Sequence, residues 1–398
     1  MAQQAQAAPL SRQVKGSQTR ADILRRAEQL SPVLRERADE AERLRKCPEA
    51  TIDDFVQSGL LRICQPARYG GYDLGYDVLC EATQILARGC GSQAWVHMVL
   101  ADNPLKLSAF PLQAQDDVWA KDDTQRIGVA VAQVGKARQV PGGVVWSGLH
   151  GFSSGIDHVH WLICGGHVIR EGEKPRALFA LIPKSDVSVI DDWRVMGLCG
   201  TGSKSFKVDE VFVPEHRLLD KAQADEGMAP GTLYYTAPVT KLPRGGVSAV
   251  SFTAIPVGVA EGFLADYLAY TAPRKSRGNA VADFVGTHIK IGMASVEIEA
   301  ASRLYLGAIR ETMQSLERGE PVPPLQNLAG KRNAAYAAQL AIRAVQTLFN
   351  DAGGRALYLT SDLQRKFRDA HAAAAHHSLV WESAAAEFGR RSLAEQGA

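Results

Sequence analysis

The chain has 398 residues, of which 46% are hydrophobic and 22% are charged, the profile of an ordinary globular protein of two or three domains. Its 45 Lys and Arg residues nearly balance 43 Asp and Glu residues, and the net charge of +2 gives no electrostatic basis for binding nucleic acid or an acidic membrane. Six cysteines without a C-x-x-C pair, no signal segment and no apolar run near 18 residues predict a soluble, cytoplasmic protein with reduced thiols.

The first third of the chain has a helical pattern. Residues 1–17 are rich in Gln and Ala, and we expect them to form a disordered tail. Over residues 18–125, apolar side chains return every three or four positions, which predicts an N-terminal helical domain. Within it, Thr51 and Asp54 have the spacing of a capping residue and its acidic partner, so they predict the start of a helix.

The pattern then changes twice. Residues 126–240 alternate apolar and polar side chains between frequent glycines, which predicts a compact β-barrel or sandwich. Residues 241–398 are again helical, with a proline-rich loop at 321–324 between two long helices. This helix–β–helix order differs from a βαβ alternation, so a Rossmann-type sheet is not expected.

Two glycine-bounded segments in the β region are candidate sites. Gly151-Phe152-Ser153-Ser154-Gly155 fits the G-x-S-x-G pattern of serine hydrolases, but that motif needs a following helix, and residues 157–166 have the pattern of a strand. The alternatives are a simple turn, or two serines that line the edge of a bound ligand. The segment 197–203, which contains Gly200-Thr201-Gly202-Ser203, is either a turn or a phosphate-binding loop. A strand pattern follows it, so it fails the dinucleotide-binding context.

Histidines are the third group of candidates. His158 and His160 lie two apart on a predicted strand without a third ligand, and His376 and His377 follow His371 at spacings other than i, i+4. We therefore expect no metal site. The small residues between His371 and His376 leave room for another group to pack against this predicted helix.

In their order along the chain, the motifs resemble the acyl-CoA dehydrogenase superfamily, and more narrowly its flavin-dependent monooxygenase branch, over residues 21–393. The resemblance rests on three segments of the sequence: 58–71 with its Arg68-Tyr69-Gly70-Gly71, 200–217, and Gln364-Arg365-Lys366-Phe367-Arg368-Asp369. It implies a mainly α fold with a helical N-terminal domain, a central β-barrel and a C-terminal four-helix bundle, assembled as a homotetramer.

One departure from the dehydrogenases determines the expected chemistry. Short- and medium-chain dehydrogenases carry a catalytic Glu about nine residues after the motif arginine, whereas counting from Arg368 leads to His377. Loss of a general base costs about 10² to 10⁴ in rate, so α,β-dehydrogenation is rejected. The resemblance instead implies O₂ chemistry, in which reduced flavin forms a C4a-hydroperoxide and a histidine with a pKa near neutrality assists at the substrate.

The resemblance also assigns roles to residues. His376 matches the family's C-terminal catalytic histidine, with His377 beside it, Ser154 matches the hydroxyl at flavin N5, and Asn103 stands where phenol hydroxylases often carry His and sulfoxidases carry Asn. Trp95 and His371 are expected to line the substrate pocket. The cofactor contacts implied by the resemblance are Ser153, Ser154, Thr201, Gly202, Ser203, Arg274, Gly353 and Gly354.

No nicotinamide-binding fingerprint occurs in the sequence, so a separate NAD(P)H:flavin reductase is expected to supply reduced FMN or FAD by diffusion. We therefore predict the oxygenase component of a two-component monooxygenase that hydroxylates a small aromatic or heteroaromatic compound. Three alternatives remain open at this point. They are an S- or N-oxygenating relative, a serine hydrolase that uses Ser153, and a non-catalytic flavin-fold scaffold.

Overall fold

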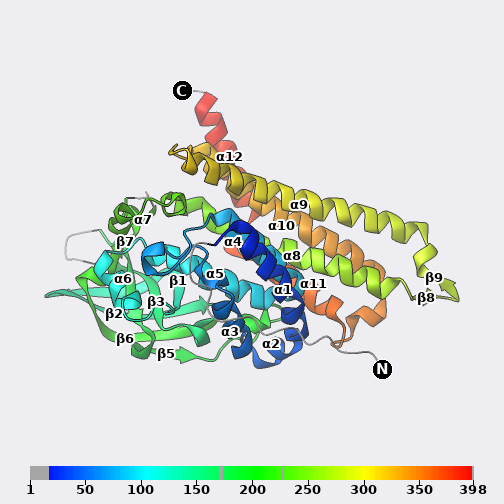
Figure 1. Cartoon of the computed structure of the whole chain (residues 1–398), viewed down its shortest axis with the longest axis horizontal. Helices are drawn as coiled ribbons and strands as arrows, with labels where there is room; N and C mark the ends of the chain where they lie inside the picture. Colours follow the sequence, from blue (N-terminus) through cyan, green and yellow to red (C-terminus); the bar gives the residue numbers. More distant parts are fainter. Residues whose placement is uncertain (1–17, 170–173, 226–227, 397–398) are drawn as a thin grey trace.

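The computed structural model describes residues 18–169, 174–225 and 228–396, so the predicted tail at 1–17 lies outside the described residues. A group of helices precedes the sheet, and a group of longer helices follows it (Figure 1). The first group comprises α1 (Arg20–Glu36), α2 (Ala38–Leu44), α3 (Glu49–Gln57), α4 (Tyr76–Gly89), α5 (Gly91–Leu107) and α6 (Leu112–Trp119).

Two helix starts in this group differ in how far the local sequence determines them. Thr19 caps α1 because its side chain accepts the Asp22 N–H while the Asp22 carboxylate accepts from the Thr19 backbone, a complete capping box. The predicted cap at Thr51 is wrong: α3 begins at Glu49, after Pro48. The Thr51 hydroxyl instead donates to Gln93 Oε1 on α5, 2.7 Å away, so a tertiary contact uses the group that resembled a cap.

The central region forms one mixed sheet of seven strands in the order β5-β6-β2-β1-β3-β4-β7. The strands are β1 (Ile127–Val140), β2 (Gly143–Ser153), β3 (Trp161–Val168), β4 (Arg176–Pro183), β5 (Val187–Ile190), β6 (Lys204–Pro214) and β7 (Leu218–Asp220). Among the strand pairs of the described residues, only β1 and β3 run in parallel. The edge strands β5 and β7 do not pair with each other in the described part of the chain, so the predicted closed barrel is wrong and the sheet is open.

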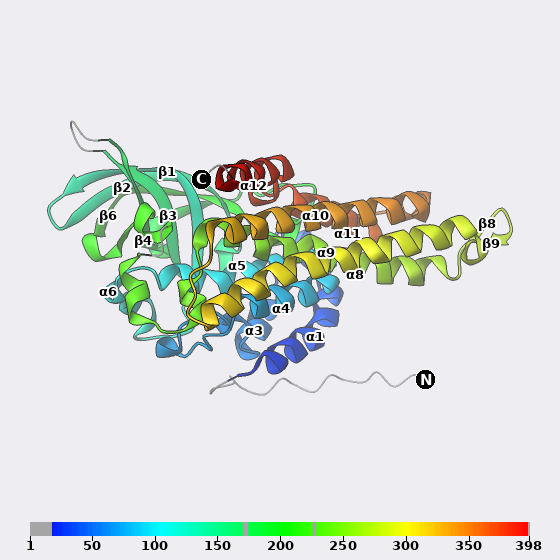
Figure 2. The ribbon, with the colours of Figure 1, turned by 90° about the horizontal axis from the view of Figure 1, so that it is seen from above.

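The last part of the chain contains the long helices. They are α8 (Arg244–Thr271), α9 (Val285–Glu317), α10 (Pro324–Ala352), α11 (Asp362–Ala374) and α12 (Trp381–Gln396), after the short α7 (Lys221–Asp225). The helices α8, α9, α10 and α11 pack against one another and extend away from the sheet to a small hairpin of β8 (Lys275–Ser276) and β9 (Asn279–Ala280) (Figure 2).

Helix α8 is the most apolar element. Its segment Ala249–Thr271 is long and apolar enough to cross a membrane by length and composition alone, contrary to the expectation that no apolar run approaches that length. However, 78% of its most apolar stretch is buried inside the protein, against α4, α10 and α11. A helix that is hydrophobic on all sides is typical of the core of a large protein, and α8 occupies that position here.

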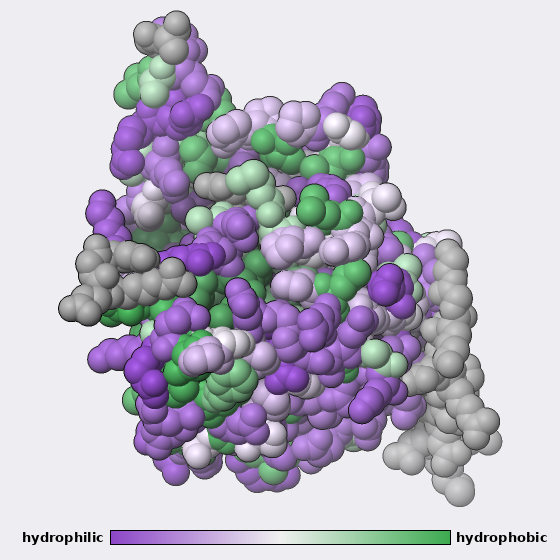
Figure 3. Space-filling model, turned by 90° about the vertical axis from the view of Figure 1, so that its left-hand side faces the viewer, coloured by the Kyte–Doolittle hydropathy of each residue, from purple (hydrophilic) through white to green (hydrophobic). Residues whose placement is uncertain are grey.

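Helix α5 connects the two halves of the molecule. It packs against β1 on one side and against α8 and α11 on another, and it also contacts the 3₁₀ helix η5 (Cys199–Thr201). Seen from its sheet end, the molecule has a mostly hydrophilic surface with separate apolar patches (Figure 3). At the junction of α5, the end of β2 and η5, some of the predicted site residues meet.

Candidate active site

A buried carboxylate holds the loop that contains η5. The Leu198 backbone N–H donates to Asp369 Oδ1 on α11 over 2.6 Å, while Leu198 has a left-handed φ of 55°. A side chain at Gly197 would put a Cβ 2.4 Å from the Arg368 carbonyl oxygen, so only glycine allows this approach to α11. Burial raises the pKa of Asp369 to about 6, although the Leu198 N–H acts in the opposite direction.

Three hydroxyls and one indole form a continuous hydrogen-bonded chain across this junction. Trp95 Nε1 on α5 donates to Ser154 Oγ over 3.0 Å, and Ser154 Oγ lies 2.7 Å from Ser203 Oγ. Ser203 Oγ lies 2.7 Å from Thr201 Oγ1, which donates to the Leu198 carbonyl oxygen over 2.9 Å. Four of the predicted site residues, from three separate segments of the sequence, are thus brought together.

His376 lies on the other side of Trp95. Its ring stacks on Phe252 of α8 with 3.8 Å between centroids, and meets Trp95 edge-on at 5.6 Å. It also caps η11 (His377–Leu379), because its Nδ1 accepts the Ser378 backbone N–H at 3.3 Å. A neutral imidazole that accepts at Nδ1 carries its proton on Nε2, so Nε2 is a hydrogen-bond donor.

The electrostatic environment of His376 corrects one expectation. Burial, and to a smaller extent the neighbouring His377, lowers the pKa of His376 to about 3 rather than leaving it near neutrality. The imidazole is therefore neutral at physiological pH. In this state His376 is suited to donate a hydrogen bond from Nε2, and it is a weaker base than the sequence suggested.

The other two histidines of this segment have different environments. His377 is exposed, with its ring centroid 4.3 Å from that of His376. His371, on α11, is half-buried, donates from Nδ1 to the Phe367 carbonyl oxygen over 2.7 Å and packs on the Phe367 ring at 4.2 Å. Of the three, His376 alone has a ring contact with Trp95 among the described residues.

Ser153 and Ser154 point in different directions. Ser153 is completely buried, and its hydroxyl has no hydrogen-bond partner among the described residues. Strand β2 ends at Ser153, and a 3₁₀ helix, η3 (Ile156–His158), and then β3 follow it instead of a long helix. An inaccessible hydroxyl without a base cannot be a nucleophile, so the hydrolase alternative fails, and Ser153 does not share the face that Ser154 presents.

Asn103 also lies apart from this group. It is buried, its Nδ2 donates to the Ile127 carbonyl oxygen over 2.7 Å, and its Oδ1 accepts from Lys106 over 3.1 Å. On the same helix as Trp95 but eight residues later, it lies about 12 Å further along the axis. The Nδ2 end of its amide joins α5 to β1, whereas the contact of its Oδ1 with Lys106 lies within α5.

Arg274, Gly353 and Gly354 form a second group at the far end of α8. The Arg274 guanidinium donates to the carbonyl oxygens of Ala352 and Asp351, directly before Gly353. Phe252, beside His376, is separated from Thr271, the last residue of α8, by about 28 Å of helix. Within one chain, the structure therefore does not bring these three residues to the hydroxyl chain.

Two participants were missed from the sequence. Phe252 stacks on His376 and packs against Trp95 at 4.9 Å, yet in the sequence it is one apolar residue in a helix that is apolar on all sides. Leu198 contributes through its backbone. Its left-handed φ could not be recognised from the sequence, because leucine rarely adopts this conformation. The position between glycines at 197 and 200 was the available signal for an unusual turn.

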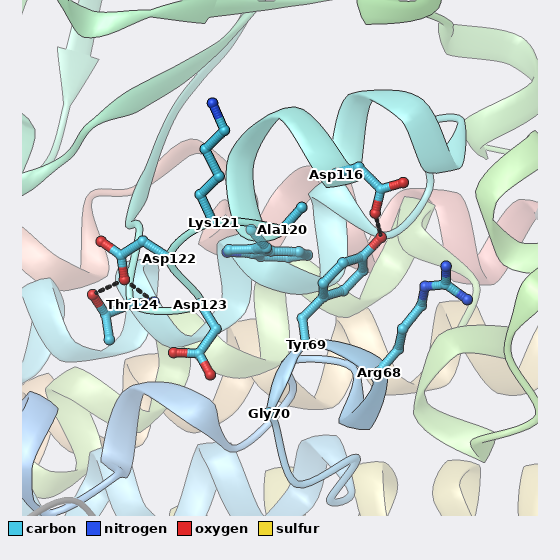
Figure 4. A pocket seen from close by; sticks show the side chains of 10 residues that line it. Arg68, Tyr69, Gly70, Asp116, Ala120, Lys121, Asp122, Asp123 and Thr124 are labelled. Atoms are coloured by element: carbon cyan, nitrogen blue, oxygen red, sulfur yellow. Dashed lines mark hydrogen bonds between the residues drawn. The ribbon is translucent and has the colours of Figure 1, made fainter.

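A wide surface depression elsewhere has a different character. It is lined by ten residues between η2 (Ala67–Tyr69) and the end of α6, among them Arg68, Lys121 and Asp122, and none of them is a predicted site residue (Figure 4). Tyr69 donates to Asp116 Oδ1 there over 2.7 Å. Charged side chains line this open depression together with Tyr69 and Trp119, and it contains no member of the Trp95–Ser154–Ser203–Thr201 chain.

Comparisons with known proteins agree with this geometry. The model of the acyl-CoA dehydrogenase N-terminal domain matches residues 26–116, and that of the acyl-CoA dehydrogenase C-terminal domain matches residues 250–381. The flavin-dependent monooxygenase oxygenase subunit HsaA of Rhodococcus jostii (strain RHA1) is 36% identical over 362 residues, which are 89% of this chain and 93% of that protein.

Solved structures give the same result. The crystal structure of 3-HSA hydroxylase from Rhodococcus sp. RHA1 superposes with a TM-score of 0.90 at 34% identity, covering 94% of this chain and 97% of that one. XiaF from Streptomyces sp., solved with FADH2 and glycerol, has a TM-score of 0.86 at 25% identity over 93% of this chain and 94% of that one.

The chain belongs to the acyl-CoA dehydrogenase family. Within that family it falls in the flavin-dependent monooxygenase branch, so it is an enzyme of that kind and an oxygenase component.

Proposed function

We propose that this oxygenase component uses reduced FMN or FAD and O₂ to hydroxylate a small aromatic or heteroaromatic substrate at the junction of α5, β2 and η5. The observation that carries the proposal is the convergence of the Trp95–Ser154–Ser203–Thr201 chain with the His376 imidazole. Relatives of this chain include enzymes named as hydroxylases of p-hydroxyphenylacetate and of resorcinol.

The residues at the junction fit a flavin. Three hydroxyls gather beside Gly202, whose left-handed φ of 53° turns the backbone between Thr201 and Ser203. Hydroxyl oxygens and backbone groups are suited to hydrogen-bond the polar edge of an isoalloxazine ring. None of the side chains in the hydroxyl chain is charged, so these contacts would add no charge beside the ring. Bound reduced flavin supplies the electrons and the activation of O₂.

The proposed roles follow from accessibility and chemistry. Ser154, with Ser203 and Thr201 behind it, holds the flavin edge, and Trp95 and Phe252 form apolar walls that exclude water. His376 donates a hydrogen bond from Nε2 toward the reacting oxygen or the substrate hydroxyl, a role that suits its low pKa. His371 and the exposed His377 are proposed to border the substrate side.

We propose that the assembly is a homotetramer. Four apolar residues of α9 are exposed at spacings that put them on one helix face, at 51 to 68% exposure: Val285, Ile289, Met293 and Val296. A second copy on this face would cover the stripe. In such an assembly, Arg274, Gly353 and Gly354 of one copy could contact the flavin bound at the hydroxyl chain of another copy, although they are too far from the hydroxyl chain of their own copy. Light scattering that gives a 43.0 kDa monomer would contradict this.

Two further expectations belong to the same proposal. All six cysteines are free thiols, and five of them are buried, which is in keeping with a reducing, cytoplasmic compartment. A separate NAD(P)H:flavin reductase supplies the reduced flavin by diffusion, because the sequence contains no nicotinamide fingerprint.

The test is a screen of phenols, indoles and thiophenes with the full chain, a generic flavin reductase, NADH and FMN or FAD in parallel. We expect incorporation of ¹⁸O from ¹⁸O₂ at carbon of at least one phenol or heteroaromatic compound. Oxidation at sulfur alone would instead identify an S-oxygenating enzyme. Failure to bind either reduced flavin in anaerobic titrations would refute the proposal.

A further inference from the structure

The hydroxyl chain has a proton order, meaning that at each contact it is fixed which hydroxyl donates and which accepts. A threonine hydroxyl has one proton, and Thr201 Oγ1 donates it to the Leu198 carbonyl oxygen at 2.9 Å. In its 2.7 Å contact with Ser203, Thr201 must therefore accept, so Ser203 donates. The single Ser203 proton is then used, so in the contact between Ser203 and Ser154 it is Ser154 that donates.

The other end of the chain is compatible with this direction and occupies one lone pair of Ser154. The indole nitrogen of Trp95 can only donate, and it donates to Ser154 Oγ. In the reversed order Ser154 would accept from both Trp95 and Ser203, its own proton would be free to point outward, and the Leu198 carbonyl oxygen would lose the Thr201 hydroxyl. The contact that ends the chain at the Leu198 carbonyl oxygen therefore gives the chain one favourable order.

Both ends are held in position. Trp95 is buried and packs against the stacked pair of Phe252, at 4.9 Å, and His376, at 5.6 Å. The Leu198 carbonyl oxygen also accepts from Trp193 Nε1 at 3.2 Å, and the Leu198 N–H is bound by Asp369. Neither end can turn away without breaking these contacts.

The consequence is a set of oxygens that can only accept. All three hydroxyl protons are committed within the chain, while Ser154, Ser203 and Thr201 each keep an unused lone pair. Ser154, the half-buried member, presents that lone pair at the accessible end. An N–H group is its natural partner, and a second lone pair would be repelled.

We propose that Trp95 and Thr201 are positioning residues that fix Ser154 as a hydrogen-bond acceptor, and that this order makes the site select the redox state of the flavin. Reduced flavin has an N–H at N5, whereas oxidised flavin has a lone pair there. The inference rests on the proposed function, because it assumes that Ser154 meets this edge. It goes beyond it by assigning the selectivity to residues behind Ser154.

The experiment measures dissociation constants for FMN and FAD, each oxidised and anaerobically reduced, in the full-length wild type and four variants. Thr201→Val removes the terminal donor with little change in shape, and Ser203→Ala removes the acceptor of the Ser154 proton. Either change frees that proton to point outward. We expect the ratio of oxidised to reduced dissociation constants to fall about tenfold, the effect of one hydrogen bond gained or lost.

Thr240→Val is the matched control. Thr240 is also buried, lies in a 3₁₀ helix (η8, Pro238–Lys241) and donates to the carbonyl oxygen three residues earlier, but it is not part of the chain. We expect it to leave the ratio unchanged. Trp95→Phe should lower the ratio less than Thr201→Val does, because Thr201 still orders the chain from the other end.

The outcomes separate this inference from the proposed function. If Thr201→Val and Ser203→Ala both keep the wild-type ratio while binding reduced flavin and supporting hydroxylation, the proton-order proposal is wrong and the function stands. A tenfold fall in the ratio, in a protein that yields no hydroxylated product from any substrate screened, would support the proton order and count against the function.

Discussion

Replacing Asp369 by asparagine and by leucine separates the two effects of its carboxylate. Both variants remove the charge and have a similar size, but only asparagine keeps an oxygen that can accept the Leu198 N–H, which Asp369 Oδ1 accepts at 2.6 Å. Asp369 is 3% exposed. Without an acceptor this backbone N–H is left unpaired in the interior, at a cost of about 1–3 kcal/mol. We therefore expect Asp369→Leu to be less stable than Asp369→Asn by that amount.

The pH dependence of the wild type gives an independent check. Burial raises the pKa of Asp369 from 3.8 to about 6, so between these values the folded state holds a proton that the unfolded state has lost. Stability from this group is therefore fully present below pH 3.8 and is lost as the pH rises through 6. At about 1.4 kcal/mol per pKa unit the loss approaches about 3 kcal/mol, and Asp369→Asn abolishes it.

The assay is urea unfolding of the three proteins at several pH values between 4 and 8, with anaerobic titration of reduced flavin alongside. We expect Asp369→Asn to gain stability relative to wild type as the pH rises, and Asp369→Leu to bind reduced flavin more weakly than Asp369→Asn, because the η5 loop loses its anchor. If Asp369→Leu equals Asp369→Asn in both stability and flavin affinity, the hydrogen bond from the Leu198 N–H to the side chain at position 369 contributes nothing to either.

Three further predictions concern other contacts. His376→Asn should leave the affinity for reduced flavin nearly intact, lower the hydroxylation rate by about 10² to 10⁴ and raise the release of hydrogen peroxide. The measurement is the amount of product and of peroxide formed per NADH consumed. Full coupled turnover in this variant would show that the histidine is structural. Arg368→Ala breaks the 2.7 Å pair with Glu42 and should cost about 1 kcal/mol of stability without changing the ratio of product to peroxide, so a collapse of that ratio would assign Arg368 to the site. Burial lowers the pKa of His97 and of His150 to about 4, so the unfolded chain binds protons at these residues first as the pH falls below 6.5. The free energy of unfolding, measured in urea from pH 7 to 5, should therefore fall by about 2 kcal/mol for each histidine. His97→Gln and His150→Phe should each reduce this fall.

The sequence by itself determined the parts that depend on local pattern. Period-three-to-four and period-two spacings predict the order of helices and strands, because burying one face imposes those spacings. The family resemblance identified Ser154, Thr201, Ser203, His376 and Trp95, which come together at one junction. His377 in the place of the dehydrogenase Glu identified the reaction class.

Only the tertiary structure decided the rest. Whether edge strands meet is a property of the whole sheet, so strand patterns predicted a barrel where β5 and β7 remain apart. The pKa of His376 depends on burial beside Phe252 and Trp95, residues more than a hundred positions away in the sequence. The proton order at Ser154 follows from contacts among α5, β2 and η5. Such contacts are long-range, and no local pattern in the sequence encodes them.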